Sequence, residues 1–521
     1  MAKLKQYLEN SWYRWASQDR QTWYAAQYQY GYGVNTRNMK NWVCLAWWQT
    51  NVTTKNNAFS YFTCWEKLYY VDSYGKIYDK EWTQMCNTWV NQGTAPNWIE
   101  FWNNIYIVWQ WWVVKVNPTT WTYTNITSSF PTYKWAWYRL TSTNVVLNYA
   151  NTFLLIWNGN VLWRISTETW TEVIKGIRFF DLSYLIYWLT QEWNYLKIYV
   201  SNWINSKIHY AKGTFDVEYT WLVQTVSLKW LALNNGWVAS DQWYDYAIFK
   251  TWEDDDWNWE YKLAKIQWYS KVDIRSTEIW WWERIFYSDN GPNIKSADWV
   301  LFAAMKDWIR TFTEYNGWLW WGCCEFPLAS NERVTNMFKF WEYLYACVYN
   351  STTEKYTQRY YDMSFHPAKY QPNGYIIGRV FDWGCAGLFK KNDQATITYN
   401  MPTGTSMELS YRYDRDTFTY NKSNFHLIKK LEDTNECYDI VVPTTPTKTD
   451  ISLLSKESWL NDLILLENWN WIQLEDMLVI PFNKTWNLLE YRFDLATNDN
   501  AKTPILFEHS LTYYDYMRKY R

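Results

Sequence analysis

The stretch Leu68-Tyr-Tyr-Val71, followed by Asp-Ser-Tyr-Gly75 and Lys76-Ile-Tyr78, recurs twice further along the chain. The second copy is Ile105-Tyr-Ile-Val108, Trp-Gln-Trp-Trp112 and Val113-Val-Lys115, and the third is Phe153-Leu-Leu-Ile156, Trp-Asn-Gly-Asn160 and Val161-Leu-Trp163. In each copy, eight positions separate the start of the first apolar run from the start of the second. Two short apolar runs joined by turn residues predict a β-hairpin.

These copies begin 37 and 48 residues apart, a spacing typical of the blades of a β-propeller. The second and third copies also end alike, in Asn117-Pro-Thr-Thr-Trp121-Thr and Ser166-Thr-Glu-Thr-Trp170-Thr. The sequence therefore predicts an all-β protein with a propeller of five to seven blades over residues 51–400. Looser copies of the pattern lie at 184–200, 243–250 with 261–268, 285–312 and 338–349.

The composition changes at Met401-Pro-Thr-Gly-Thr405, which is typical of a turn or linker. Short alternating strands follow it, and residues 456–467 read as a short helix or a buried crossover. This pattern predicts a β-sandwich over residues 401–521. Residues 1–50 are predicted to be an N-terminal arm or the strand that closes the propeller ring. The predicted sandwich strands are 406–413, 425–431, 438–442, 471–480, 488–495 and 505–514.

The sequence lacks the features that are typical of several classes of function. The net charge is −2, so no overall positive field attracts nucleic acid. No run of about 18 apolar residues could span a membrane, and the start of the chain has no apolar segment of a secretory signal. The four histidines form no HExxH pair, the eight cysteines form no CxxC pair, and no P-loop or nucleophile elbow occurs. No catalytic residue is indicated, which favours a non-enzymatic role.

Tryptophan and glycine stand in an abnormal ratio, with 45 Trp and 16 Gly in 521 residues. Glycine normally makes up about 7% of a chain, and hairpin turns need it for positive φ. Six Asn-Trp and four Asp-Trp dipeptides occur where Asn-Gly and Asp-Gly would form turns, and Trp112 aligns with Gly75 of the repeat. We therefore predict a lineage that reads UGA as glycine, with strained turns and exposed indoles near Trp112 and Trp280-Trp281-Trp282. The alternative is a Trp-rich surface that stacks on sugar rings.

Both ends of the chain carry a resemblance. The closing segment from Asn487 to Asp515 is similar to the last hairpin of many phage tail and structural proteins. The stretch from Asn35 to Cys44 resembles their N-terminal arm if Trp42 is read as glycine. The layout of arm, propeller and terminal sandwich also resembles virion-associated propeller proteins of tailed phages.

This resemblance implies a structural or binding component of a virion, in the tail, the baseplate or the host-recognition apparatus. Its partners would be other virion proteins or further copies of the chain, and a host-surface glycan. No nucleic acid is expected as a partner, although Lys5, Arg14, Arg20 and Arg37 lie among aromatic residues of the arm. The alternative is a secreted or cell-surface carbohydrate-active propeller, either a glycosidase or a lectin.

One metal site can be considered from the sequence. Asp254, Asp256 and Asn258 place oxygen atoms at alternate positions, as a calcium-binding loop does, but Lys265 stands where the bidentate acid belongs. An acidic, solvated turn is the alternative, and calcium is the only cofactor to consider. A glycosidase would need two carboxylates beside the sugar, and the candidates near strand ends are Asp181, Asp245, Asp289 and Asp382.

Overall fold

In the computed structural model, the described residues form 43 β-strands and no α-helix. The all-β prediction is confirmed. The described part also holds no helix that is long and apolar enough to cross a membrane. The structure describes residues 4–9, 30–38, 43–52, 58–72, 74–88, 97–108, 112–129, 146–149, 153–158, 161–166, 173–178, 183–192, 194–212, 222–233, 237–240, 244–251, 261–266, 272–279, 294–297, 300–304, 308–315, 318–363, 367, 369–378, 389–413, 422, 425–432, 463–465, 472–474, 476–481, 484–486 and 489–516.

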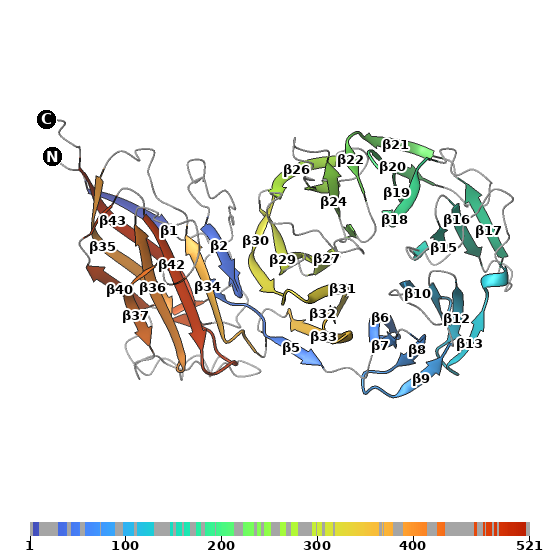
Figure 1. The fold of residues 1–521 in the computed structure, drawn as a ribbon, viewed down its shortest axis with the longest axis horizontal. Coiled ribbons are helices and arrows are strands. Elements are labelled where there is room, and N and C mark those ends of the chain that lie inside the picture. Colours follow the sequence, from blue (N-terminus) through green and yellow to red (C-terminus); the bar gives the residue numbers. More distant parts are fainter. Residues whose placement is uncertain are drawn as a thin grey trace. The chain divides into compact units, whose positions relative to one another are not determined.

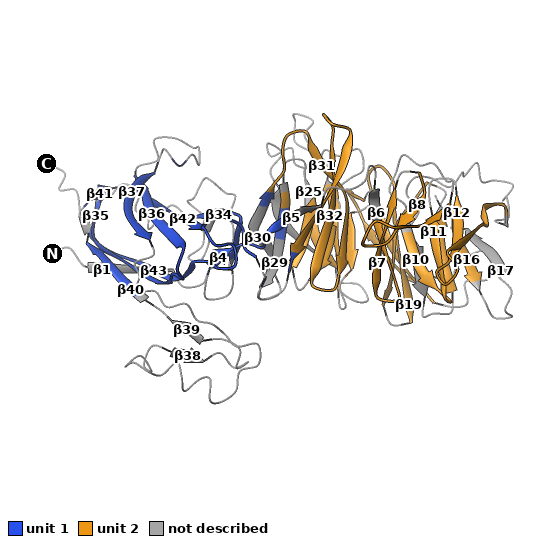
Figure 2. Cartoon of the chain, turned by 90° about the horizontal axis from the view of Figure 1, so that it is seen from below, with its two compact units in different colours: residues 1–49, 310–326, 362–521 blue, residues 50–309, 327–361 orange. Residues whose placement is uncertain are grey.

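The chain forms two compact units (Figure 2). Unit 1 comprises residues 1–49, 310–326 and 362–521, and unit 2 comprises residues 50–309 and 327–361.

Unit 2 is built on a ring of sheets (Figure 1). In the described residues, strand pairing defines seven antiparallel sheets, so the propeller has seven blades, within the predicted range. Strand pairing also places β29 and β30 in the sixth blade, although residues 310–326 fall in unit 1. The first four blades are β6(Ala58–Cys64)–β7(Lys67–Asp72)–β8(Lys76–Tyr78)–β9(Gln84–Asn87), β10(Asn97–Phe101)–β11(Asn104–Val108)–β12(Val113–Asn117)–β13(Thr122–Asn125), β14(Val146–Tyr149)–β15(Phe153–Asn158)–β16(Val161–Ser166)–β17(Val173–Arg178) and β18(Leu185–Glu192)–β19(Tyr195–Ser201)–β20(Ser206–Ala211)–β21(Leu222–Leu228).

The remaining three blades close the ring. Inner strands are in contact from the fifth blade through the sixth and seventh to the first, where β31 contacts β6, and onward from the first blade to the fourth. The seventh blade takes its last strand, β5, from the N-terminal side of the chain. These blades are β22(Leu231–Ala232)–β24(Asp245–Thr251)–β25(Tyr261–Ile266)–β26(Val272–Ile279) with β23(Val238–Ser240) on β24, β27(Ile294–Ala297)–β28(Val300–Ala304)–β29(Trp308–Tyr315)–β30(Trp318–Pro327), and β31(Glu332–Phe340)–β32(Tyr343–Asn350)–β33(Lys355–Asp362)–β5(Gln49–Val52).

The three sequence repeats are hairpins, as predicted. They form the pairs β7–β8, β11–β12 and β15–β16. Every side chain from Ile105 to Val108 is buried, because this strand packs against the neighbouring blade on each face. A strand buried on both faces reads as a continuous apolar run instead of an alternating one.

Two antiparallel sheets of unit 1 share one hydrophobic core, to which both contribute buried side chains such as Ile397, Leu511, Leu409 and Phe493. One sheet has the order β3(Thr36–Asn38)–β4(Val43–Leu45)–β43(Ile505–Tyr516)–β35(Phe389–Asn400)–β40(Asp476–Pro481), with β1(Leu4–Glu9) on β43 and β41(Thr485–Trp486) on β35. The other has the order β2(Tyr30–Val34)–β34(Asn373–Gly378)–β42(Leu489–Thr497)–β36(Thr405–Tyr413)–β37(His426–Glu432).

These sheets take strands from both sides of the ring, a pairing that the sequence boundaries did not anticipate. Strands β2 to β4 precede the ring, while β34 and β35 lie before residue 401, where the predicted sandwich begins. A strand's own residues define its faces but not its partner, so the pattern could not assign β34 and β35 to these sheets. Residues 463–465, inside the segment read as a helix or crossover, form strand β38(Leu463–Leu465), which pairs with β39(Ile472–Leu474).

Two segments of unit 1 that flank the propeller in the sequence are hydrogen-bonded to each other. The backbone N–H of Trp48 donates to the carbonyl of Lys369 at 3.0 Å, and that of Gln371 donates to Ala46 at 2.8 Å. All strands of the seven blades, from β5 to β33, therefore lie in the sequence between two hydrogen-bonded segments of unit 1.

Candidate functional site

The calcium-loop candidates Asp254, Asp256 and Asn258 lie outside the described residues. No group of three or more His, Cys, Asp or Glu side chains in the described part is placed to hold a metal ion. The calcium site therefore stays a prediction. Asp181, Asp289 and Asp382 also lie outside the described residues, which leaves Asp245 as the described member of the carboxylates considered for glycoside hydrolysis.

Asp245 lies at the start of β24 and is buried. Its Oδ2 atom accepts hydrogen bonds from Thr190 Oγ1 at 2.9 Å, Lys197 Nζ at 3.0 Å and Tyr199 Oη at 2.5 Å. The three donors come from β18 and β19 of the fourth blade, whereas Asp245 belongs to the fifth. Glu192 of β18 also pairs with Lys197. The cluster is a buried ionic contact between two blades.

The surroundings of Asp245 give it a structural role. Burial, and next the negative charge of Asp245, raise the pKa of Tyr199 well above its usual value, so this phenol keeps its proton and donates it. A buried carboxylate is tolerated when such donors satisfy it. General acid catalysis needs a carboxyl group within reach of substrate, and this one is enclosed by the protein. Asp245 therefore holds two blades together.

We expect Asp245→Asn to lower the free energy of unfolding by about 2–4 kcal/mol, because Lys197 would keep its buried charge with one carboxylate fewer. Urea unfolding followed by fluorescence measures this change. Glu432→Gln, which breaks an exposed ion pair with Lys430, is the matched control and should leave the urea midpoint unchanged. An Asp245→Asn protein as stable as its parent would show that the contact does not hold the blades.

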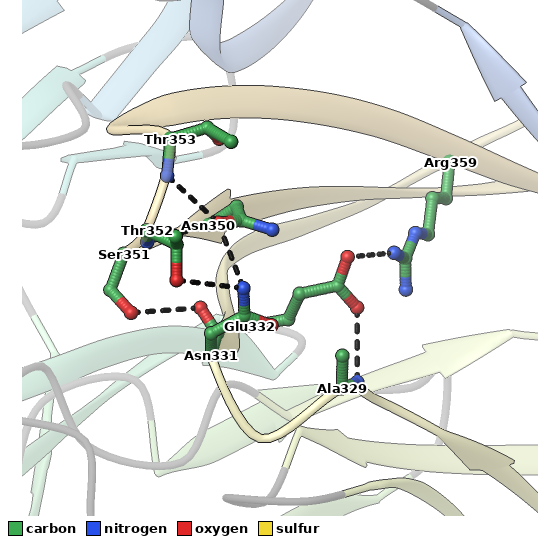
Figure 3. Close-up of polar contacts among 8 residues, drawn as sticks. All are labelled: Ala329, Asn331, Glu332, Asn350, Ser351, Thr352, Thr353 and Arg359. Carbon is green, nitrogen blue, oxygen red and sulfur yellow. Dashed lines mark hydrogen bonds and ion pairs between the residues drawn. The ribbon is translucent and has the colours of Figure 1, made fainter.

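The seventh blade carries a second polar cluster (Figure 3). Glu332 begins β31, and its Oε1 accepts from Arg359 Nη2 of β33 at 2.5 Å. Its Oε2 accepts from the backbone N–H of Ala329 at 3.1 Å. Beside it, the amide of Asn331 donates to Asn350 Oδ1 at 3.1 Å. These bonds tie the start of the inner strand to the third strand and to the turn after the second.

That turn follows a pattern seen in three blades. Asn350 Oδ1 accepts from the backbone N–H groups of Thr352 and Thr353 at 3.0 and 3.1 Å (Figure 3). Asp72 and Asn202 cap the equivalent turns of the first and fourth blades in the same way. An Asp or Asn at this position satisfies the turn's own N–H groups. These side chains therefore have a structural role in the turns.

Several turns contain tryptophan in a conformation that this residue rarely adopts. Ten non-glycine residues of the described part have a positive φ, and six of them are tryptophan. Steric clash of Cβ makes positive φ an outlier for bulky residues. The six are Trp65 (47°), Trp82 (65°), Trp102 (46°), Trp121 (54°), Trp230 (60°) and Trp341 (51°).

Other tryptophans belong to the hydrophobic core. Trp157 and Trp486 are fully buried, and Trp47, Trp163 and Trp237 nearly so. At Trp112 the indole is exposed, as predicted, but Trp112 is not among the described residues with positive φ. Trp280-Trp281-Trp282 lies outside the described residues. The described tryptophans thus include a turn group and a core group, a division that residue counts alone did not reveal.

Comparison with known proteins adds little beyond the fold. Neither a family model nor a curated protein matches the chain. Solved structures similar to it include a luciferin-regenerating enzyme (10% identity, 51% of this chain, 90% of that chain, TM-score 0.32). They also include a chain of the mitotic checkpoint complex (10%, 51%, 86%, 0.29) and the Dos1 propeller (8%, 68%, 96%, 0.34). All three TM-scores lie below 0.5, so the propeller assignment rests on the strand pairing of this chain.

Proposed function

We propose that the protein is a non-enzymatic structural or binding component of a tailed-phage particle, in its tail, baseplate or host-recognition apparatus. One observation carries the non-enzymatic part: Asp245, the described carboxylate among the glycosidase candidates, is buried and bonded to three donors. The phage assignment is supported by the similarity of the two chain ends to virion proteins.

The architecture suits a role in assembly. A propeller is a rigid ring that presents many loops, and loops on a rigid scaffold commonly carry binding surfaces. In the sequence, the propeller strands lie between two segments of unit 1 that are hydrogen-bonded to each other. Other virion proteins or further copies of this chain are the proposed partners, and a host-surface glycan is a further one.

We also propose that the gene comes from a lineage that reads UGA as glycine. The support is the excess of Trp over Gly together with the six tryptophans at positive φ. Glycine is the residue that such backbone conformations favour. The loop at 254–260 would then regain the glycine that a calcium loop needs, and weak calcium binding there remains part of the proposal.

A cell-surface lectin is the second candidate, and one observation favours it. Trp203 is 93% exposed, and Trp230, 60% exposed, is held beside the same turn by a hydrogen bond from its N–H to Asn205 Oδ1 at 2.9 Å. Two exposed indoles on neighbouring turns could stack on sugar rings.

Fractionation of the native source separates these candidates. We expect peptides of this protein in purified particles, at a constant ratio to the major virion protein through a density gradient. Recovery solely from cell-wall or secreted fractions would contradict the virion role. A glycan array with the recombinant protein and Trp203→Ala tests the lectin, because stacking on Trp203 would make binding depend on that indole.

A further inference from the structure

We infer that residues 65, 82, 102, 121, 230 and 341 are glycine in the native protein, while residues 157 and 486 are tryptophan. The inference rests on the proposed codon reassignment and resolves it position by position. It also has a functional consequence, because the exposed indoles at these turns would not then be a ligand platform.

The first step is the conformation of the hairpins. Trp65 and Trp102 each lead a two-residue turn, since Cys64 pairs with Lys67 and Phe101 pairs with Asn104. Both residues of each turn have positive φ, at 47° and 61° in one and 46° and 56° in the other. That is the type I′ geometry, which Asn and Gly normally occupy.

The turn at Trp341 is a variant of the same hairpin. Phe340 pairs with Tyr343, and of the two residues between them Trp341 has the positive φ. A positive φ at the first turn residue alone is the type II′ arrangement, which has glycine there. The hairpins of the first, second and seventh blades, which are neighbours in the ring, thus all require positive φ where this sequence has tryptophan.

The second step concerns two longer turns between the last strands of blades. The N–H of Trp82 donates to the Asp79 carbonyl at 3.0 Å, and the N–H of Trp121 donates to the Asn117 carbonyl at 2.8 Å. The Asp79 and Asn117 side chains accept N–H groups inside the same turns. A positive-φ residue closing an Asp- or Asn-capped turn is a glycine position.

The third step is the surroundings of the indoles. Trp65, Trp102, Trp230 and Trp341 are 51%, 53%, 60% and 64% exposed, so burial does not offset the backbone strain. Trp82 and Trp121 differ, because their rings lie 4.5 and 4.8 Å from those of Tyr70 and Tyr69. Their indoles contribute some packing, and the sharpest test uses the exposed positions.

The core group shows the opposite features. Trp157 is fully buried within the cluster formed by the third and fourth blades. Trp486 is fully buried in unit 1, and its Nε1 donates to Asn392 Oδ1 at 2.7 Å. Glycine would leave a large cavity at either site. Tryptophan is the residue that these two sites fit.

The consequence is a change in the face that carries these hairpins. With glycine at 65, 102 and 341, the exposed turn side chains are Glu66, Asn103 and Glu342. The hairpin ends of three neighbouring blades then present carboxylates and an amide instead of three indoles. Exposed indoles that could stack on sugar rings would then be present at these hairpins only where UGA is translated as tryptophan.

Two triple variants of the full chain test the assignment. Trp65→Gly/Trp102→Gly/Trp341→Gly is expected to raise the folding equilibrium constant about tenfold per site, because each non-glycine residue in the left-handed region costs roughly 1–2 kcal/mol. The corresponding alanine triple is the matched control, since it removes the indoles but keeps Cβ. Urea unfolding should show a higher midpoint for the glycine triple than for the parent and the alanine triple. Equal midpoints for the two triples, or a lower midpoint for the glycine triple, would overturn the assignment.

Peptide masses from the native source give the second readout. Glycine at 65, 102 and 341 with tryptophan at 157 and 486 is the expected result, and tryptophan at the first three positions would overturn it. The fraction in which the protein is found tests the virion role separately. Failure of that role is therefore distinguishable from failure of the glycine assignment.

Discussion

Acidification from pH 7 to pH 3 is expected to lower the free energy of unfolding by about 4 kcal/mol through His509 alone, at 1.36 kcal/mol for each unit of pKa shift. His509 is fully buried in unit 1, and burial lowers its pKa from 6.5 to about 3. Its Nε2 lies 2.8 Å from the hydroxyl of Tyr411, and the rings of Tyr491 and Phe493 pack around it.

The direction of this effect follows from proton binding. Between pH 6.5 and 3 the unfolded chain protonates this histidine, while the folded chain keeps it neutral. The unfolded state therefore binds more protons, and stability falls as the pH drops through this window. Above pH 6.5 both states are neutral at this residue, so the contribution to stability is complete there.

Urea unfolding of the full chain at pH 7, 5 and 4 measures the slope. His509→Phe removes the titrating group and should flatten the slope below pH 6.5, at the cost of a partner for Tyr411. His426→Phe is the control, because His426 is exposed at the start of β37, and it should keep the slope of the parent. The same pH slope in His509→Phe and the parent would rule out this histidine as the source of the acid sensitivity.

Gly378→Ala is expected to destabilise unit 1 by about 3 kcal/mol or more, because overpacking a well-packed core site costs this much when the neighbours cannot move. Gly378 ends β34, and a Cβ there would lie 2.0 Å from Cζ and 2.1 Å from Cε1 of Tyr491. The Tyr491 ring is fully buried and covers the glycine, so it has little room to shift.

Gly404→Ala provides a contrast within the same unit. At Gly404 the nearest atom to a new Cβ is Asp499 Cβ at 3.8 Å, so the expected cost is the backbone strain at φ +83°, about 1 kcal/mol. A double-mutant cycle of Gly378→Ala with Tyr491→Ala should show coupling, since removing the ring removes the clash. Additive losses in this cycle would mean that the ring does not restrict this position.

Much of the propeller could be predicted because its information is local. The repeats at 68–78, 105–115 and 153–163 contain both the hairpin and its spacing, and all three form the expected strand pairs. The sheets of unit 1 depend on partners far apart in the sequence. For example, Gly374 pairs with Leu495, and the residues of neither strand identify the other strand as the partner.

The candidate site depended on distant residues in the same way. The donors to Asp245 lie 46 to 55 positions away, so the sequence could place Asp245 near a strand end but could not show that it is enclosed. The Asn-Trp and Asp-Trp dipeptides did not locate the six tryptophans at positive φ, because none of the six follows Asn or Asp, and Trp98 of the Asn97-Trp98 dipeptide lies within strand β10. The numbers of Trp and Gly in the sequence showed that the composition is abnormal. The φ angles and the burial of the structure were needed to distinguish Trp121, which lies in a turn, from Trp157, which lies in the core.

The hydrogen-bonded segments at Trp48 and Lys369 have a consequence for biosynthesis. Strands β2 and β4 leave the ribosome early, yet their partners β34 and β43 follow the whole ring in the sequence. At about 5–20 residues per second, the 314 residues from Gln49 to Asp362 separate these events by roughly 15–60 s. All strands of the ring, including β5, are complete once residue 362 has been made. The propeller can therefore close while the first strands of unit 1 still await their partners, so the inserted module is the first to mature.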